Sequence, residues 1–117
     1  KTNMYWKNIA AVREAAGKNL KVIIEAPQLT EEEIHRAVNL CIQAEADYVK
    51  TSTGWYPSHP SALSHIQLMS DAAKGRIKIK AAGGIRTLET ILAMEKAGCD
   101  RFGISISSAL KLFHDLY

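Results

Sequence analysis

The chain has 117 residues, of which 47% are hydrophobic and 23% are charged, and this is the composition of an ordinary globular domain. Lys and Arg exceed Asp and Glu by 15 to 12, and the resulting net charge of +3 is too small to indicate a nucleic-acid-binding protein. No apolar run approaches the roughly 20 residues needed to cross a bilayer, so we expect no membrane partner and a cytoplasmic location.

Helical and strand-like patterns alternate from the start of the chain. Asn3 is predicted to cap an amphipathic helix, and the branched apolar run over residues 20–25 predicts a buried strand. Thr30 and Glu33 have the spacing of a capping box, and the apolar residues behind them recur at helical intervals. Residues 47–51 are the next predicted strand.

The second half of the chain repeats this alternation. A loop over residues 52–60 is expected to lead into a helix that ends near Gly75. A strand, a helix capped by Thr87, another strand and a final helix are then expected at residues 76–81, 88–98, 101–105 and 108–116.

The order is therefore one leading helix and about four strand–helix units, within a single domain over residues 1–117. Short strands separated by helices of this length indicate an α/β fold with parallel pairing and right-handed crossovers. An open doubly wound sheet and part of a TIM (β/α)8 barrel both fit this order. A complete barrel needs about 250 residues, so this chain has material for a half-barrel.

The cysteines and histidines do not indicate a metal site or a disulfide. Cys41 and Cys99 fall in helical patterns far apart and are interpreted as small buried apolar residues. The four histidines show no metal-ligand spacing with one another or with the cysteines. We therefore expect no metal site.

Two lysines end neighbouring predicted strands, where parallel α/β folds gather their ligand sites. Lys50 follows Tyr48 and Val49 and precedes the small residues of "TSTG", and Lys80 ends the next strand. Since neighbouring strands lie roughly 4.8 Å apart, the two ammonium groups can approach each other if both side chains point the same way.

A crowded lysine can become a nucleophile. Its ordinary pKa is roughly 10.4, and lowering that pKa to about 7 costs about 4 kcal/mol. A second positive charge about 5 Å away contributes roughly 3 kcal/mol at an effective dielectric constant of about 20, and desolvation can supply the rest. On this pattern alone, two solvated strand-end lysines, or lysines paired with a carboxylate such as Glu25, remain an alternative.

Glycine-rich turns follow the last two predicted strands. Gly83 and Gly84 follow one strand, and Gly103 precedes Ile104 and Ser105 in the other, each just before a helix. Exposed backbone N–H groups at helix starts bind phosphate, and barrels often have phosphate sites in their last two units. One glycine pair is more often only a tight turn, but two in successive units favour an anion site.

These blocks together resemble a known enzyme family. The segments "LKVIIEAPQLTEEE", "ADYVKTSTGW", "IKAAGGIRTLET" and "RFGISIS" are similar to the C-terminal half of deoxyribose-phosphate aldolases, which are class I aldolases with a TIM-barrel fold. The similarity runs from about Ile9 to Leu112, and the K-T-S-T-G and K-x-A-G-G-[IV]-R-T blocks are specific to that family.

The resemblance implies a lyase that cleaves 2-deoxy-D-ribose 5-phosphate reversibly to acetaldehyde and D-glyceraldehyde 3-phosphate without a cofactor. It implies that Lys50 forms the Schiff base and that Lys80 is the neighbouring cation that keeps Lys50 nucleophilic. The implied phosphate-binding residues are Thr53, Gly83, Gly84, Gly103 and Ser105.

Two departures from the family pattern stand out. Trp55 occupies the place of a lysine that contacts phosphate in some members, so that contact is expected to be absent. The family's proton-relay aspartate lies in the N-terminal half and has no counterpart here. Glu25 is given no catalytic role, and Arg86 is interpreted as a structural ion-pair partner.

Three functional hypotheses remain. The first is an active aldolase completed by the missing N-terminal half-barrel or by a second copy of this chain. The second is a catalytically silent half-barrel or phosphate-binding module that lacks the proton relay. The third is a related Schiff-base aldolase with another acceptor. Because an isolated half exposes its sheet edges and its interior, we expect association with one of those partners.

Overall fold

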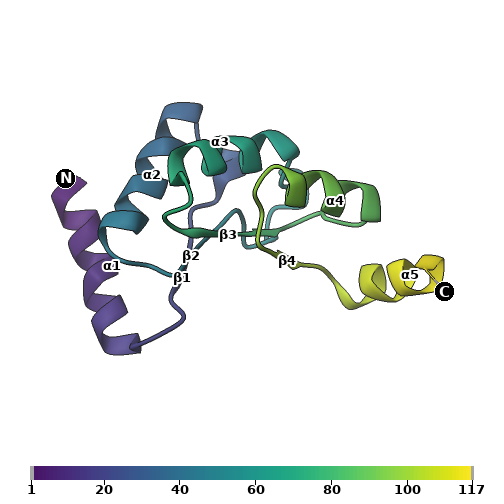
Figure 1. Ribbon diagram of the computed structural model, residues 1–117, viewed down its shortest axis with the longest axis horizontal. Helices are drawn as coiled ribbons and strands as arrows, with labels where there is room; N and C mark the ends of the chain where they lie inside the picture. Colours follow the sequence, from purple (N-terminus) through teal and green to yellow (C-terminus); the bar gives the residue numbers. More distant parts are fainter. Residues whose placement is uncertain (1, 117) are drawn as a thin grey trace.

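The computed structural model describes the backbone of residues 2–116 and the side chains of residues 7–115. Five α-helices, four strands and one 3-10 helix follow one another in the described part of the chain (Figure 1). They are α1 (Thr2–Ala16), β1 (Lys21–Ile23), η1 (Ala26–Gln28), α2 (Glu31–Gln43), β2 (Tyr48–Lys50), α3 (Leu63–Ala73), β3 (Lys78–Ala82), α4 (Leu88–Lys96), β4 (Arg101–Gly103) and α5 (Ile106–Leu116).

The four strands form one parallel sheet in the order β1-β2-β3-β4. Each crossover between neighbouring strands contains a helix, as parallel pairing requires. Sequential order without a switch point is that of a barrel and not of a doubly wound sheet. The prediction of a leading helix and four βα units of a (β/α)8 barrel is confirmed.

Helices cover one face of the sheet only. In Figure 1, α2, α3 and α4 lie above the strands, and α5 extends away from the body of the molecule. The covered face contributes Val49, Ile79 and Ala81 to the core, where each is at most 2% exposed. These side chains pack with buried residues of the helices, among them Ile34, Val38, Cys41, Ile66, Met69 and Met94.

The cysteines belong to the structure of this core. Cys41 and Cys99 are both buried and unpaired, which confirms their interpretation as small apolar residues. Burial raises the pKa of the Cys41 thiol to about 12, because the thiolate would lose its hydration. Among the described helices, none has both the length and the apolar character that a membrane span requires.

Two details of the first units differ from the prediction. Residues 20–25 were expected to be a buried strand, but β1 has three residues and Ile23 is 42% exposed. β1 is an edge strand whose second face has no cover within the described chain, and Glu25 ends it with a left-handed backbone at φ 54°. Asn3 does not precede the first helix but lies inside α1.

The caps predicted at Thr30 and Thr87 are confirmed, whereas the final helix begins at Ile106 and not at residue 108 as predicted. The Thr30 hydroxyl accepts a hydrogen bond from Glu33 N at 3.2 Å, and Glu33 Oε1 accepts one from Thr30 N at 2.9 Å. These bonds lower the pKa of the Glu33 carboxyl, the backbone bond from Thr30 having the largest effect. Thr87 caps α4 by accepting from Thr90 N.

Buried hydroxyl groups fasten the loop after β2 to the end of β3. Thr51 is fully buried, and its Oγ1 accepts from Ala82 N at 3.0 Å and lies 2.7 Å from Ser61 Oγ. Thr51 and Ser61 both donate toward the carbonyl oxygen of Ala82, and Ser61 N bonds to Gly83 O at 3.0 Å. Both ends of the 52–60 loop are therefore held against the end of β3, at Ala82 and Gly83.

Replacing Thr51 with valine keeps the shape of the side chain but removes this hydroxyl. The Ala82 N–H then stays buried without its acceptor, so we expect the free energy of unfolding to fall by about 2–3 kcal/mol in urea titrations. Thr51→Ser restores the hydroxyl and should recover most of that loss. An equal loss in both variants would show that the methyl group, and not the hydrogen bonds, is responsible.

Candidate active site at the carboxyl ends of the strands

The two predicted site lysines are direct neighbours in the sheet. Lys50 of β2 pairs in register with Lys80 of β3. Residues paired in register in a parallel sheet place their side chains on the same face. The faces of Val49 and Ile79 are buried beneath the helices, so Lys50 and Lys80 both point to the opposite, open face.

Positive charge accumulates around Lys80. Its pKa lies below the ordinary lysine value, chiefly because burial removes water from the ammonium group. The neighbouring cations Lys21, Lys50 and Arg101 lower the same pKa further. The side chain runs along β4, since its Cε would lie 3.6 Å from a Cβ added at Gly103.

A cavity of about 380 Å³ opens at the carboxyl ends of β2, β3 and β4. Lys50 lines it together with all the residues predicted to bind phosphate, namely Thr53, Gly83, Gly84, Gly103 and Ser105. Lys80 lies beside this cavity as the partner of Lys50. Residues from three successive βα units, up to 55 positions apart, therefore meet at one site.

The two glycines after β3 allow the backbone to approach this cavity. Gly83 has φ +95°, and a Cβ there would lie 3.0 Å from Ser52 Oγ. Gly84 has φ +76°, and its added Cβ would lie only 2.6 Å from Pro60 Cβ. Both the left-handed backbone and the close neighbours exclude a side chain, so the peptide groups form the cavity wall.

The start of α5 forms the other wall. Ser105 precedes the helix, and its Oγ accepts a hydrogen bond from Ser108 N at 3.2 Å. Ser108 also lines the cavity. A helix start with free N–H groups and hydroxyls next to glycine peptides can bind an oxyanion by backbone donors.

Glu25 stabilises the loop that carries Thr53, which is the third wall of the cavity, and sequence analysis missed this role. Its carboxylate oxygen Oε1 accepts a hydrogen bond from Thr53 N, joining the end of β1 to the loop after β2. The Thr53 hydroxyl accepts from Trp55 N at 3.1 Å, so its own proton remains available to a ligand. Glu25 lies two residues after β1, at the end of the strand that the sequence predicts, and that position was the available signal for a site role.

Arg86 and Trp55 lie near the cavity and differ from each other in charge and contacts. Neither of the two ion pairs among the described side chains includes Arg86, which lines the cavity instead. Its interpretation as a structural ion-pair partner finds no partner among the described side chains and stays a prediction. Trp55 is 79% exposed at the loop and brings no charge to the cavity.

The arrangement combines a lysine beside a second lysine with a pocket of backbone donors. A lysine next to another cation loses its proton more easily and can attack a carbonyl group. The donors a short distance away can hold an anionic group of the same ligand. Within the described residues, no three His, Cys, Asp or Glu side chains gather in a way that could hold a metal ion.

Comparison with known sequences finds relatives that share one enzyme name. No protein-family model matches the chain. A deoxyribose-phosphate aldolase of Aquifex aeolicus is 53% identical over 93 residues, which are 80% of this chain and 42% of that protein. The deoxyribose-phosphate aldolase of Mycoplasma pneumoniae is 44% identical over 110 residues, or 93% of this chain and 48% of that protein.

Solved structures agree with these relatives. An aldolase called QR15 superposes with a TM-score of 0.84 at 43% identity, covering 98% of this chain and 53% of QR15. The deoxyribose phosphate aldolase of Aeropyrum pernix, described as a tetramer, gives a TM-score of 0.82 at 30% identity, covering 95% of this chain and 48% of its own.

The chain spans about half the length of the curated relatives that it matches. Its β2 and β3 ends, its glycine turns and its four-unit sheet all fall within this matched part. The chain belongs to the deoxyribose-phosphate aldolases and corresponds to about half of such a protein.

Proposed function

We propose that this chain supplies the Schiff-base half of an aldolase that cleaves 2-deoxy-D-ribose 5-phosphate to acetaldehyde and D-glyceraldehyde 3-phosphate. The observation that carries the proposal is the in-register pairing of Lys50 with Lys80 beside the glycine-lined cavity. Residues 1–117 act as one domain in this proposal. The buried, unpaired cysteines fit the cytoplasm, where thiols stay reduced.

Lys50 is the nucleophile in the proposed reaction. Its neutral amine adds to the aldehyde carbon of the open-chain sugar, and loss of water leaves an iminium ion. The bond between C2 and C3 then breaks, its electrons move to the iminium nitrogen as an enamine, and the C3 hydroxyl loses its proton. Protonation of the enamine at C2 and hydrolysis release acetaldehyde and free Lys50.

Lys80 assists by its charge. Two ammonium groups in adjacent register repel each other, so the pair holds its second proton weakly and one neutral amine becomes available. The pKa of Lys80 is lowered chiefly by burial, and the positive charge of Lys50 is among the neighbours that lower it further. In this proposal Lys80 is a positioning and charge-tuning residue, and only Lys50 bonds to the substrate.

The phosphate occupies the cavity wall of backbone donors. The glycine peptides at Gly83, Gly84 and Gly103 and the hydroxyls of Thr53 and Ser105 are the proposed contacts. Arg86 adds a guanidinium to the same cavity, and this group pairs well with phosphate oxygens. In this proposal, binding of the phosphate group at one end of the sugar aligns the aldehyde carbon at its other end with the Lys50 amine.

A silent phosphate-binding half-barrel remains the second candidate. The proposed cleavage needs a base for the C3 hydroxyl, and the cavity lining contains no carboxylate. In the active alternative a partner half-barrel, or a second copy, supplies that base. A related aldolase with another acceptor would keep the same Lys50 chemistry and differ only in the sugar phosphate.

Borohydride trapping distinguishes the active from the silent candidate. With acetaldehyde and borohydride, we expect a stable ethyl adduct on Lys50, located by peptide mass mapping, because an iminium at this amine is reducible. Lys50→Leu should abolish it, while Lys96→Leu on the exposed surface of α4 should not. An unmodified Lys50, or equal labelling of all exposed lysines, would favour the silent half-barrel.

The pH dependence of that adduct tests Lys80. Replacing Lys80 with methionine removes the positive neighbour of Lys50, so adduct formation near pH 7 should slow about tenfold. Because the Lys80 pKa is below the ordinary value, its charge fades as pH rises, and the two rates should converge in alkali. Identical pH profiles would show that Lys80 does not tune Lys50.

Phosphate binding is tested by NMR without any turnover. Titration with inorganic phosphate should shift the amide resonances of Gly83, Gly84 and Gly103. The turn glycines Gly17 and Gly75 also have positive φ but lie away from the cavity, so their amides are matched controls. Equal shifts in both sets, or none in the first, would contradict the proposed phosphate site.

A further inference from the structure

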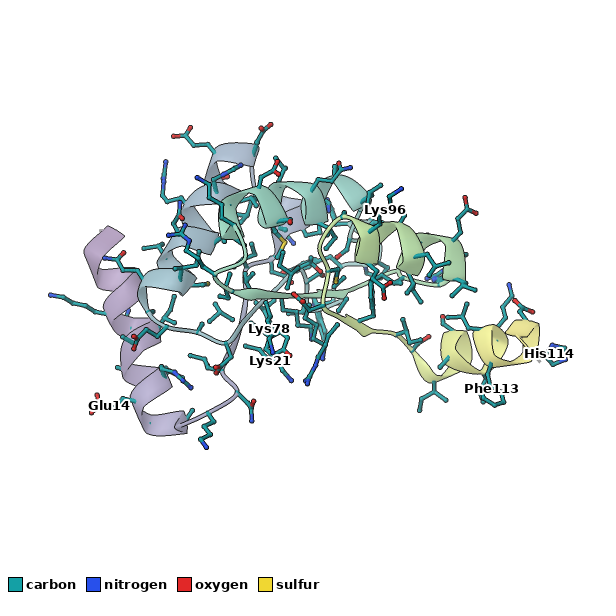
Figure 2. All side chains as sticks on the ribbon, viewed as in Figure 1. Glu14, Lys21, Lys78, Lys96, Phe113 and His114 are labelled. Carbon is teal, nitrogen blue, oxygen red and sulfur yellow. The ribbon has the colours of Figure 1, made fainter. Side chains whose placement is uncertain are left out.

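The open face of the sheet is strongly positive. Its strand residues include no acidic residue and five cations, which are Lys21, Lys50, Lys78, Lys80 and Arg101. Figure 2 shows Lys21 and Lys78 pointing away from α2 and α3, whereas Lys96 lies on the helical side. The Nζ atoms of Lys21 and Lys78 each lie 5.7 Å from the centroid of the Tyr48 ring, and Arg101 Cζ lies 5.0 Å from the same centroid. A carboxylate on this face would be attracted to several charges at once.

Glu25 is the acidic residue that strand alternation would place there. Lys21 and Ile23 of β1 both lie on the open face, and residues two positions apart on an extended strand share a face. A chain that stayed extended through residue 25 would therefore turn the carboxylate toward the row of Lys50, the register partner of Ile23. Neither ion pair among the described side chains includes Glu25. Its carboxylate accepts from Thr53 N instead.

A left-handed residue diverts the chain at this point. Glu25 has φ 54° and ψ 50°, a conformation that costs free energy for a residue with a side chain. Ile24 N donates to Lys50 O at 3.0 Å. Two residues later, Ala26 N donates to Thr51 O at 2.7 Å. Regular parallel pairing would carry this second bond one carbonyl further along the chain, so Glu25 is the extra residue of a bulge.

The bulge holds three points of the following unit. The backbone of residues 24–26 bonds to the carbonyl oxygens of Lys50 and Thr51, and the Glu25 side chain bonds to the N–H of Thr53. Glu25 directly precedes η1, but its side chain makes no capping hydrogen bond to that helix. Backbone strain that is retained beside a site indicates a functional constraint.

We propose that Glu25 is a positioning residue that sets the separation between the Lys50 amine and the phosphate contact at Thr53. The inference rests on the proposed aldolase function, since it concerns the same nucleophile and the same phosphate site. It makes Glu25 a determinant of substrate class, which favours aldehydes with a phosphate at the far end of the chain over the same aldehydes without one.

The role has a physical reason on each side of the bulge. A substrate held at both ends reacts fast only if the distance from nucleophile to anion site matches its length, and a small displacement reduces the rate strongly. Three hydrogen bonds from consecutive residues leave the segment from Lys50 to Thr53 little freedom to shift. A carboxylate paired with Lys50 or Lys80 would instead stabilise the ammonium form and oppose the reaction.

The test separates the side chain of Glu25 from its backbone. Glu25→Gly keeps the left-handed conformation without strain and removes the acceptor. Glu25→Gln keeps a side-chain oxygen that can accept from Thr53 N and removes the charge. Glu45→Gly is the matched control, because Glu45 is also a left-handed glutamate, at φ 61°, and lies exposed in the turn before β2, outside the cavity lining. Circular dichroism verifies that each variant is folded.

The measured quantity is the phosphate preference of Lys50. It is the rate of borohydride trapping with 2-deoxy-D-ribose 5-phosphate divided by the rate with 2-deoxy-D-ribose at the same concentration. We expect this ratio to fall about tenfold in Glu25→Gly, to recover in Glu25→Gln and to keep its wild-type value in Glu45→Gly. A general loss of structure would lower both rates alike. An unchanged or higher ratio in Glu25→Gly, or an equal fall in either other variant, would overturn the proposal.

Inorganic phosphate gives a readout that does not need the Schiff base. In the wild type, phosphate should shift the amide resonance of Thr53 together with those of Gly83 and Gly84. In Glu25→Gly the glycine shifts should remain, whereas the Thr53 shift should be lost. If Lys50 is not trapped in the wild type, the aldolase function fails, and this titration alone decides the role of Glu25. No Thr53 shift in the wild type, or the same shift in both proteins, would show that Glu25 does not position Thr53.

Discussion

The parallel register between β2 and β3 is the constraint on which the rest of the structure depends. It pairs Lys50 with Lys80 and leaves both on the face away from the helices. The same register places Val49 and Ile79 on the other face, where they are almost fully buried. A slip of one residue would put the ammonium groups into the apolar core, so burial of the core and placement of the lysines are one and the same requirement.

The loops at the carboxyl ends of the strands are held by polar contacts between successive units. Glu25 reaches from the end of β1 to Thr53, and Thr51 reaches from the end of β2 to Ala82. The Gly83 and Gly84 peptides then pack against Ser52 and Pro60 of the preceding loop. Each unit thus positions the site residues of the next, although three different loops build the cavity.

The two faces of the sheet have opposite physical requirements. The helical face obtains its stability from burial of apolar side chains, which the chain supplies by itself. The open face carries a partly exposed Ile23 and Tyr48, whose ring is shielded by charged side chains. It also carries five cations, which are Lys21, Lys50, Lys78, Lys80 and Arg101.

Much of this arrangement could be predicted from the sequence, because its signals are local. Strand and helix order follows from the spacing of apolar residues, and the Thr30 and Thr87 caps follow from their immediate neighbours. Alternation along each strand is enough to place Lys50 and Lys80 on the same face, but Lys80 lies in the middle of β3 and not at its end as predicted, because pairing with β4 extends the strand to Ala82. The glycine turns that line the cavity were recognisable from their position after strands.

The tertiary structure alone decided the contacts between units. Arg86 lines the cavity and forms no ion pair with the described side chains. Glu25 accepts a hydrogen bond from a backbone N–H and not from a lysine, and three cations surround the Tyr48 ring. These contacts join residues that are distant in sequence, and only the register and the twist of the packed sheet bring them together. A local pattern can therefore specify which face of a strand a residue lies on, but which neighbour its side chain meets depends on how the strands pack.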